Sequence, residues 1–246
     1  DIQLSYFKAN VIDIEAVRYI AIFSALDIIC KEQKIKHIID GRNVVTEITL
    51  PQAWICKNSA NLKDIHKKYG KVPLKSYPIM SPIRRRIVAK TRPFQSWPLL
   101  NYVDYQKEQV KKVITDELGW RDYGGKHYES VFTRFYQGYI LPKKFFIDKR
   151  KAHLSNLIFS KQMTRLEAIE ILQKPTYAED LQRQDFEFVA KKLGFSNTEF
   201  KQLLEMENNP HSKFGTDVGM IKLVQKMLYL IKPFTLLFKK IFHGKG

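Results

Sequence analysis

Hydrophobic positions recur at helical spacing near the start of the chain. Between residues 15 and 33, apolar side chains fall every three or four positions, which predicts a helix. The short apolar run IKHIID, residues 35–40, predicts a buried strand that is closed by Gly41. A helix, a strand and a glycine turn in this order are typical of an open α/β sheet, where ligands bind beyond the carboxyl ends of strands. The segment GRNVVTE, 41–47, would lie at such an end, although the spacing fits an ordinary connection equally well.

The hydrophobic pattern is irregular between residues 51 and 100. Prolines interrupt it at positions 51, 73, 78, 82, 93 and 98. The sequence therefore predicts irregular structure there, with the basic run at 81–93 as a solvated face.

From about residue 106 onward the pattern predicts helices. Residues 104–120 predict an amphipathic helix that ends at Gly119, a residue type common just after helix ends. The segments TRLE (164–167) and SNTE (196–199) match the capping box that opens a helix. We therefore divide the chain into an α/β portion at 1–103, a helical portion at 104–215 and a basic amphipathic tail at 216–246.

Two further stretches admit more than one interpretation. Residues 185–204 could form a helix-turn-helix, but the second helix carries Glu199, Glu205 and a single lysine, so we favour two packed helices over a DNA reader. Lysines interrupt the apolar tail at 219–242, which argues against a membrane span. We favour a tail helix packed on its own domain and broken at Pro233, with peripheral membrane contact as the alternative.

Composition narrows the class of partner. The chain has 246 residues, 44% of them hydrophobic, and 42 Lys and Arg against 25 Asp and Glu give a net charge of +17. Such an excess favours polyanions: nucleotides, nucleic acid or an anionic membrane. Cys30 and Cys56 form no CxxC pair, so we expect no disulfide framework, no metal site in this chain and a cytoplasmic location. Because the chain opens without Met or a signal peptide, we expect its true start upstream.

The segment 119–139, GWRDYGGKHYESVFTRFYQGY, predicts a helix over Lys126–Tyr139 with two distinct faces. One face carries Tyr128, Val131, Phe132, Phe135, Tyr136 and Tyr139. The other carries Lys126, His127, Glu129, Ser130, Thr133, Arg134 and Gln137. The complete division predicts that the aromatic stripe is core.

The polar face of that predicted helix suggests an anion site. Lys126 and His127 would occupy the first turn after Gly124 and Gly125, with Arg134 on the same face. Cations are disfavoured at a helix N-terminus unless an anion binds there, so we predict a phosphate cradle.

Residues 147–159, IDKRKAHLSNLIF, repeat this arrangement. Asp148 can cap a helix whose first turn holds Lys149, Arg150 and Lys151. Two cation-rich helix starts predict an anionic ligand between them, whereas solvated surface charge is the simpler alternative.

The block 118–158, LGWRDYGGKHYESVFTRFYQGYILPKKFFIDKRKAHLSNLI, closely resembles the N-acetyl sugar amidotransferases. These are PP-loop ATP pyrophosphatases of bacterial surface-polysaccharide (lipopolysaccharide O-antigen) and flagellin-glycan pathways. Similar pieces occur at 7–26, 38–51, 63–70, 77–81 and 160–172. The family's SGGxDS phosphate loop and N-terminal cysteine cluster, a possible zinc site, are absent from this sequence and are expected upstream.

The resemblance implies an α/β fold class: the later half of a PP-loop (adenine nucleotide alpha hydrolase-like) parallel-sheet domain, followed by a mostly α-helical C-terminal domain. The chain would then represent the C-terminal two-thirds of the enzyme.

The implied reaction uses ATP and Mg²⁺ to convert the acetamido group of a nucleotide-linked sugar into an acetamidino group. ATP would adenylate the amide oxygen, and ammonia would displace AMP. The resemblance also implies a glutaminase and a synthase-like subunit that supply ammonia, because neither cysteine lies in a G-x-C-x-G nucleophile elbow. No nucleic acid partner is expected.

The resemblance implies specific roles for matched positions. The nucleotide would lie beside Gly41, Asn43, Thr46 and Glu47. Phosphate contacts would come from Lys126, Arg134, Lys149 and Arg150, with the backbone at Gly124 and Gly125. His127 and Glu129 would orient substrate or transfer a proton, although such residues are more often caps or surface groups. Asp122 and Tyr123 would shape the turn.

Two other functions remain open. A PP-loop enzyme that modifies tRNA would also suit the charge, but RNA tracking prefers a continuous basic groove with exposed aromatic residues. A non-catalytic module that docks an ammonia-producing partner is the second alternative.

Overall fold

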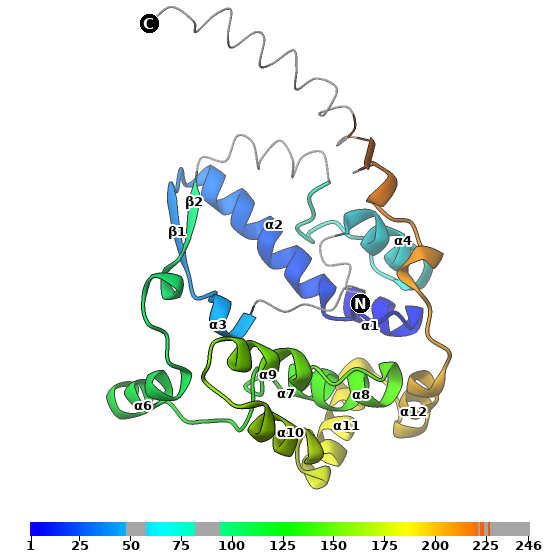
Figure 1. Ribbon diagram of the computed structural model, residues 1–246. Coiled ribbons are helices and arrows are strands. Elements are labelled where there is room, and N and C mark those ends of the chain that lie inside the picture. Colours follow the sequence, from blue (N-terminus) through cyan, green and yellow to red (C-terminus); the bar gives the residue numbers. More distant parts are fainter. Residues whose placement is uncertain (48–57, 82–93, 221, 224–225, 227–246) are drawn as a thin grey trace, which may run out of the picture.

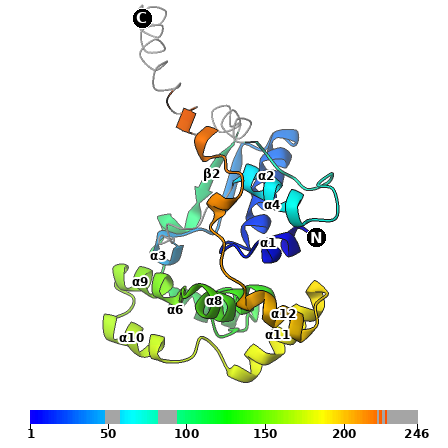
Figure 2. The same ribbon diagram turned by 90° about the vertical axis from the view of Figure 1, so that its right-hand side faces the viewer.

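The computed structural model describes residues 1–47, 58–81, 94–220, 222, 223 and 226 of the chain. Figures 1 and 2 show the elements in two tiers. The first tier contains α1 (Ile2–Ala9), α2 (Ala16–Glu32), α4 (Ser59–Tyr69), β1 (His37–Asp40) and β2 (Gln95–Pro98). The second contains α6 (Lys107–Leu118), α7 (Val131–Phe135), α8 (Leu141–Phe145), α9 (Arg150–Phe159), α10 (Arg165–Gln173), α11 (Glu179–Leu193) and α12 (Asn197–Glu205). The described residues are therefore mostly helical with a small sheet.

The sheet consists of the parallel pair β1 and β2, with His37 opposite Gln95 and Asp40 opposite Pro98. This confirms the predicted strand, but it is not buried, because Ile39 is 71% exposed. The carboxyl ends of both strands meet at one edge. The short helix α3 (Val44–Glu47) follows β1 there and packs against α9, where the two tiers meet.

The prediction of irregular structure over 51–100 was wrong in two places. Helix α4 forms because the Asn58 side chain caps it, accepting the N–H of Asn61 at 3.0 Å. Strand β2 is only four residues long and ends at Pro98, so its sequence shows no recognisable alternation of apolar and polar residues. The predicted solvated run at 81–93, Cys56 and most of the predicted tail lie outside the described residues.

One hydrophobic core joins the two tiers. Phe7 on α1 contacts Phe132 and Phe200, with ring centroids 6.0 and 5.8 Å apart. Phe186 and Phe200 lie 5.1 Å apart, so residues 185–204 form two packed helices, as predicted. The core therefore crosses the predicted boundary at residue 103, and the division into domains stays a prediction.

The helix ends follow the predicted signals. Gly119 ends α6 in the left-handed conformation at φ 63°. Both predicted capping boxes are present, with Thr164 and Glu167 opening α10 and Ser196 and Glu199 opening α12. Among the described residues, no helix has both the length and the apolar character needed to traverse a bilayer.

A π-helical turn, Tyr136–Ile140, separates α7 from α8. Pro142 has no N–H, so the Gly138 carbonyl loses the donor that an α-helix would provide four residues later. The Thr176 hydroxyl donates to that carbonyl instead, at 2.5 Å. The proline and this tertiary contact together account for the irregular turn.

Residues 209–217 clasp the first tier. The Asp217 carboxylate accepts the N–H and the hydroxyl of Ser59, both at 2.8 Å, and thereby caps the start of α4. Asn209 donates its side-chain amide to the Ala9 carbonyl and its N–H to the Asn10 carbonyl, both at 2.9 Å. A segment late in the sequence thus caps the end of α1 and the start of α4.

Candidate functional site: a basic cluster beside the strand ends

The helix predicted over Lys126–Tyr139 begins later than expected. Ser130 is its N-cap, and α7 starts at Val131. Before it lies a turn in which Gly124 has φ 83° and His127 has φ 66°. Asp122 shapes this turn, as predicted, by accepting the Gly124 N–H at 2.9 Å. Lys126 therefore lies outside the helix, and the helix dipole gives no support for an anion at this position.

The aromatic stripe is core, as predicted, but the polar face is not open to a ligand along its length. Phe135 and Tyr136 are buried, and so are Thr133 and Gln137 on the opposite side. The hydroxyl of Thr133 donates to Glu15 at 2.9 Å, and the Gln137 amide donates to the same carboxylate at 3.3 Å. The prediction of an outward polar face is wrong here because a buried acid on the preceding tier receives these groups.

Arg134 points into the protein rather than toward Lys126. Its guanidinium donates two hydrogen bonds to the Asp185 carboxylate, at 2.8 and 2.7 Å, and lies 5.8 Å from the Tyr177 ring centre. The bonded carboxylate raises the pKa of Arg134. Because Arg134 is paired with Asp185, it does not serve as the third basic residue of the predicted phosphate cradle beside Lys126 and His127.

Arg150 is also engaged within the chain. It donates to the Asp148 carboxylate at 2.8 Å and to the carbonyls of Lys174 and Ile171 at 2.9 and 3.2 Å. These carbonyls lie at the end of α10, where a cation is favourable. Asp148 accepts the Arg150 N–H at 2.9 Å, which fits its predicted role at the start of α9.

The structure does bring the segment 41–47 to Lys126. The ammonium group of Lys126 donates to the Thr46 carbonyl at 2.9 Å and lies 3.3 Å from the Glu47 carboxylate. Asn43 caps α3 by accepting the Thr46 N–H at 2.9 Å. The segment lies at the carboxyl edge of the strands, as predicted, and the contact spans 80 residues of sequence.

The predicted glycine positions, Gly41 and the pair Gly124 and Gly125, differ in whether a side chain would fit. A side chain at Gly41 would meet no atom within 4 Å, so packing places no demand on that position. A Cβ at Gly125 would lie 2.6 Å from the Tyr128 ring, and Gly124 has a positive φ. Glycine is therefore required at the turn that carries Lys126 and not at the end of β1.

Helices α6 and α9 add further basic side chains. The rings of His127 and His153 lie edge to face with centroids 6.4 Å apart. His127 also lies 3.8 Å from the Glu129 carboxylate, an exposed side chain. We define the basic cluster as Lys107, Lys126, His127, Lys149 and His153, whose charges act on one another.

Burial lowers the pKa of Lys107, Lys126, His127 and His153, and neighbouring cations lower it further at all of these except Lys126. Burial lowers the pKa of Lys126, opposed by Glu47, and lowers that of Lys107 with help from Lys111. Burial, then Lys126 and Lys149, lowers the pKa of His127. The same causes lower the pKa of His153 to about 3. A bound anion would relieve this repulsion, so the arrangement suits an anionic ligand.

Sequence reasoning missed Lys107 and His153. His153 follows Lys149 by four residues, which places both on one face of α9 and was a usable signal. Lys107 offered no local signal, because the fold brings α6 to the cluster.

No group of three His, Cys, Asp or Glu side chains that could hold a metal ion occurs in the part of the chain that the structure describes. The acids beside the cluster, Glu47 and Glu129, contact Lys126 and His127. We therefore assign no step to a metal held by these residues.

Comparison with known families finds a match for most of the second tier. Residues 129–228 match the family described as the LPS biosynthesis protein WbpG-like, C-terminal domain. The matched region holds α7 to α12, with Lys149 and His153, and begins two residues after His127. It confirms the resemblance of this part to the C-terminal portion of an LPS biosynthesis protein. No curated protein and no solved structure matches the chain.

Proposed function

We propose that this protein acts in lipopolysaccharide biosynthesis as an ATP-dependent amidotransferase that converts the acetamido group of a nucleotide-linked sugar into an acetamidino group. The basic cluster at the carboxyl edge of β1 and β2 is the observation that carries the proposal. It lies where parallel sheets bind ligands, and its half-buried cations suit phosphate groups. The WbpG-like region supports the pathway, and the sequence resemblance supports the reaction.

The chemistry needs charge stabilisation and positioning more than covalent catalysis. An amide oxygen is a poor leaving group, and transfer of an adenylyl group from ATP to it, with loss of pyrophosphate, makes it a good one. Ammonia then forms the new C–N bond, the C–O bond breaks and AMP leaves. Lys107, Lys126 and Lys149 would neutralise phosphate charge on the ligands.

His127 is the candidate for the proton that the incoming nitrogen loses. Burial and neighbouring cations lower its pKa, so the ring is neutral near pH 7 and can accept a proton. Glu129, at 3.8 Å, would stabilise the imidazolium that results. His127 has a positive φ, a backbone conformation that non-glycine residues adopt rarely and that clusters at functional sites.

The partners are part of the proposal. Free ammonia is scarce near neutral pH, so a glutaminase with a synthase-like subunit would supply it. Mg²⁺ would accompany ATP, held by its phosphates.

The direct test is to incubate the full-length protein with ATP, an ammonium salt and a panel of nucleotide-linked N-acetyl sugars. Mass spectrometry should find a product lighter by the difference between O and NH, together with AMP and pyrophosphate. Lys126→Ala should lose this activity, whereas Lys191→Ala, an exposed site on α11, should retain it.

The other outcomes separate the alternatives. Cleavage of ATP to AMP without any change in a sugar would show that the substrate class is wrong and would direct the assay to tRNA. ATP left intact with ammonium in excess would contradict the enzyme proposal and favour a docking module.

A further inference from the structure

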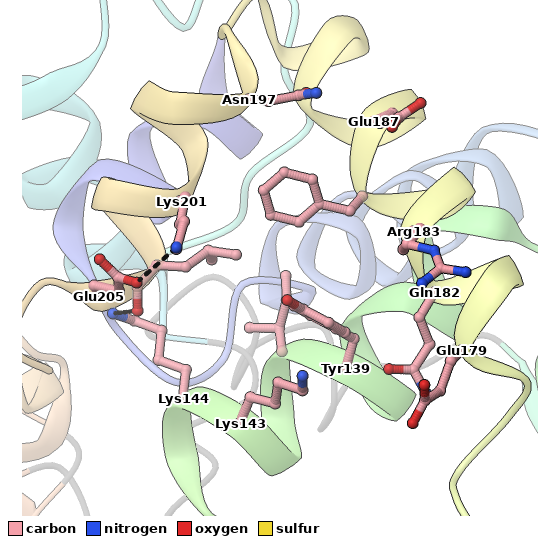
Figure 3. A pocket seen from close by; sticks show the side chains of 13 residues that line it. Tyr139, Lys143, Lys144, Glu179, Gln182, Arg183, Glu187, Asn197, Lys201 and Glu205 are labelled. Carbon is pink, nitrogen blue, oxygen red and sulfur yellow. Dashed lines mark hydrogen bonds and ion pairs between the residues drawn. The ribbon is translucent and has the colours of Figure 1, made fainter.

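A cavity of about 550 Å³ opens between the π-helical turn, α8, α11 and α12 (Figure 3). No residue of the basic cluster lines it. Its volume falls within the range of about 300–1,000 Å³ typical of small-molecule sites. Nothing in the proposed reaction accounts for it.

The floor of the cavity is a fixed aromatic surface. Tyr139 stacks on Phe135 with centroids 4.9 Å apart and planes at 15°, and Phe186 meets Tyr139 edge to face at 6.2 Å. Tyr139 and Phe186 remain partly exposed, and Ile140 and Leu204 complete the floor. The π-helical turn carries Tyr139 and Ile140, and such turns occur frequently at functional sites.

Two lysines at the rim retain donors for a ligand. The ammonium group of Lys143 lies 4.6 Å from the Tyr139 ring centre, and within the described chain it has no carboxylate within 4.0 Å. Lys201 lies 4.0 Å from Glu205, and both side chains are exposed, so this ion pair is weak. Lys144 differs, because it donates to the carbonyls of Leu204 and Met206 at the end of α12.

The opposite rim offers planar polar groups. Figure 3 shows Glu179 and Gln182 on α11 across the cavity from the lysine side, with Asn197 at a third edge, whereas the guanidinium of Arg183 points away and pairs with Asp180. Carboxylate and amide groups suit hydroxyl groups, because each can make two coplanar hydrogen bonds. The cavity therefore combines an aromatic floor, planar polar groups and lysine side chains.

We propose that this cavity binds an acidic sugar, a pyranose ring that carries a carboxylate or a phosphate group. The C–H face of a pyranose would pack on Tyr139 and Phe186, its hydroxyls would meet Gln182 and Glu179, and its acidic group would meet the lysine side. An apolar ligand would make no use of the charged groups at the rim. Inorganic phosphate would make no use of the aromatic floor.

The test measures binding by calorimetry with three probes: methyl glucuronide, glucose 6-phosphate and the neutral methyl glucoside. The two acidic sugars should bind at least about tenfold more tightly than the neutral one, because a charge-assisted hydrogen bond is lost in the latter. Comparison of the carboxylate and the phosphate probes identifies the preferred acidic group.

Matched variants locate the binding. Lys143→Ala with Lys201→Ala should raise the Kd for the acidic sugar about tenfold or more. Lys191→Ala, on α11 but outside the cavity, should leave the Kd unchanged, and circular dichroism should show that every variant folds. Lys126→Ala should also leave it unchanged, so this test is separate from that of the amidotransferase.

Three results would overturn the proposal. These are no binding of any probe, equal affinity for neutral and acidic sugars, or binding that Lys126→Ala abolishes and the Lys143 and Lys201 variant leaves intact.

Discussion

The basic cluster and the surroundings of Arg134 begin from the same kind of sequence but differ in what neutralises their charge. Arg134 makes two hydrogen bonds to Asp185, whose side chain is 4% exposed. Lys126 approaches Glu47 at 3.3 Å, and the charges that act on His153 come from other basic groups. The charge of Arg134 is neutralised by Asp185, whereas the basic cluster would be stabilised by a bound anion.

This difference shows that a run of cations in a sequence does not by itself indicate a ligand. Asp185 lies 51 residues from Arg134, and Glu15 lies 118 residues from Thr133. Such partners are supplied by the fold. Four substitutions test whether the two regions differ as described.

The largest effect is expected for Asp185→Ala. It leaves the buried guanidinium of Arg134 without a partner, which should lower the free energy of unfolding by about 3–5 kcal/mol. Urea unfolding measures the change. Asp180→Ala, which removes an exposed partner of Arg183, is the control and should cost less than about 0.5 kcal/mol. Equal effects would mean that Arg134 is not a buried ion pair.

The second effect is acid sensitivity caused by His153. Its pKa is lowered in the folded protein from 6.5 to about 3, so the unfolded chain binds the extra proton between these values. The contribution of His153 is present above pH 6.5 and is lost as the pH falls toward 3, by about 2–4 kcal/mol.

His153→Gln should flatten this part of the profile of unfolding free energy against pH. Pyrophosphate should raise the pKa of His153, measured from its ring proton by NMR, because an anion relieves the repulsion. A His153 that titrates near 6.5 without any ligand would remove the case for a crowded cluster.

The third effect is a modest loss of stability in Arg150→Ala. The variant loses the bonds to Asp148 and to the carbonyls at the end of α10, and we expect a cost of about 1–2 kcal/mol. Thermal unfolding compares it with Lys151→Ala, an exposed neighbour that should change stability by less than about 0.5 kcal/mol. A cost no larger than that of Lys151→Ala would mean that these bonds do not hold Arg150, which could then contact a ligand.

The smallest effect on stability is expected for Lys126→Ala, at under about 0.5 kcal/mol, because it removes repulsion as well as two contacts. Its affinity for pyrophosphate should nevertheless fall about tenfold. The pKa of both histidines should rise, since Lys126 lowers each. Unchanged pyrophosphate affinity would argue that the cluster is not a phosphate site.

Local signals in the sequence predicted the elements that depend on local chemistry. The helix at 16–32, the strand at 37–40, the glycine end of α6 and both capping boxes were predictable because each is decided within a few residues. Helix α4 was not predicted because it lies in a segment interrupted by prolines. The start of α7 was predicted too early because the cap at Ser130 outweighs the amphipathic pattern before it.

The candidate site was predictable in part. The strand end and the turn with Lys126 were both found from local sequence, although their contact across 80 residues was not. Arg134 and Arg150 were predicted as ligand contacts because their partners cannot be read from neighbouring positions. His153 could have been found from its spacing to Lys149.

The clasp formed by residues 209–217 has a consequence for how the chain acquires its structure. Asp217 binds the start of α4 at Ser59 from 158 residues later in the sequence. Asn209 binds the end of α1 at Ala9 from 200 residues later. Contacts of such long range slow folding. A nascent chain on the ribosome would hold α1 and α4 without these long-range bonds until residues 209–217 have been synthesised. A chain that stopped before residue 209 would lack these bonds, and we expect such a product to be prone to aggregation.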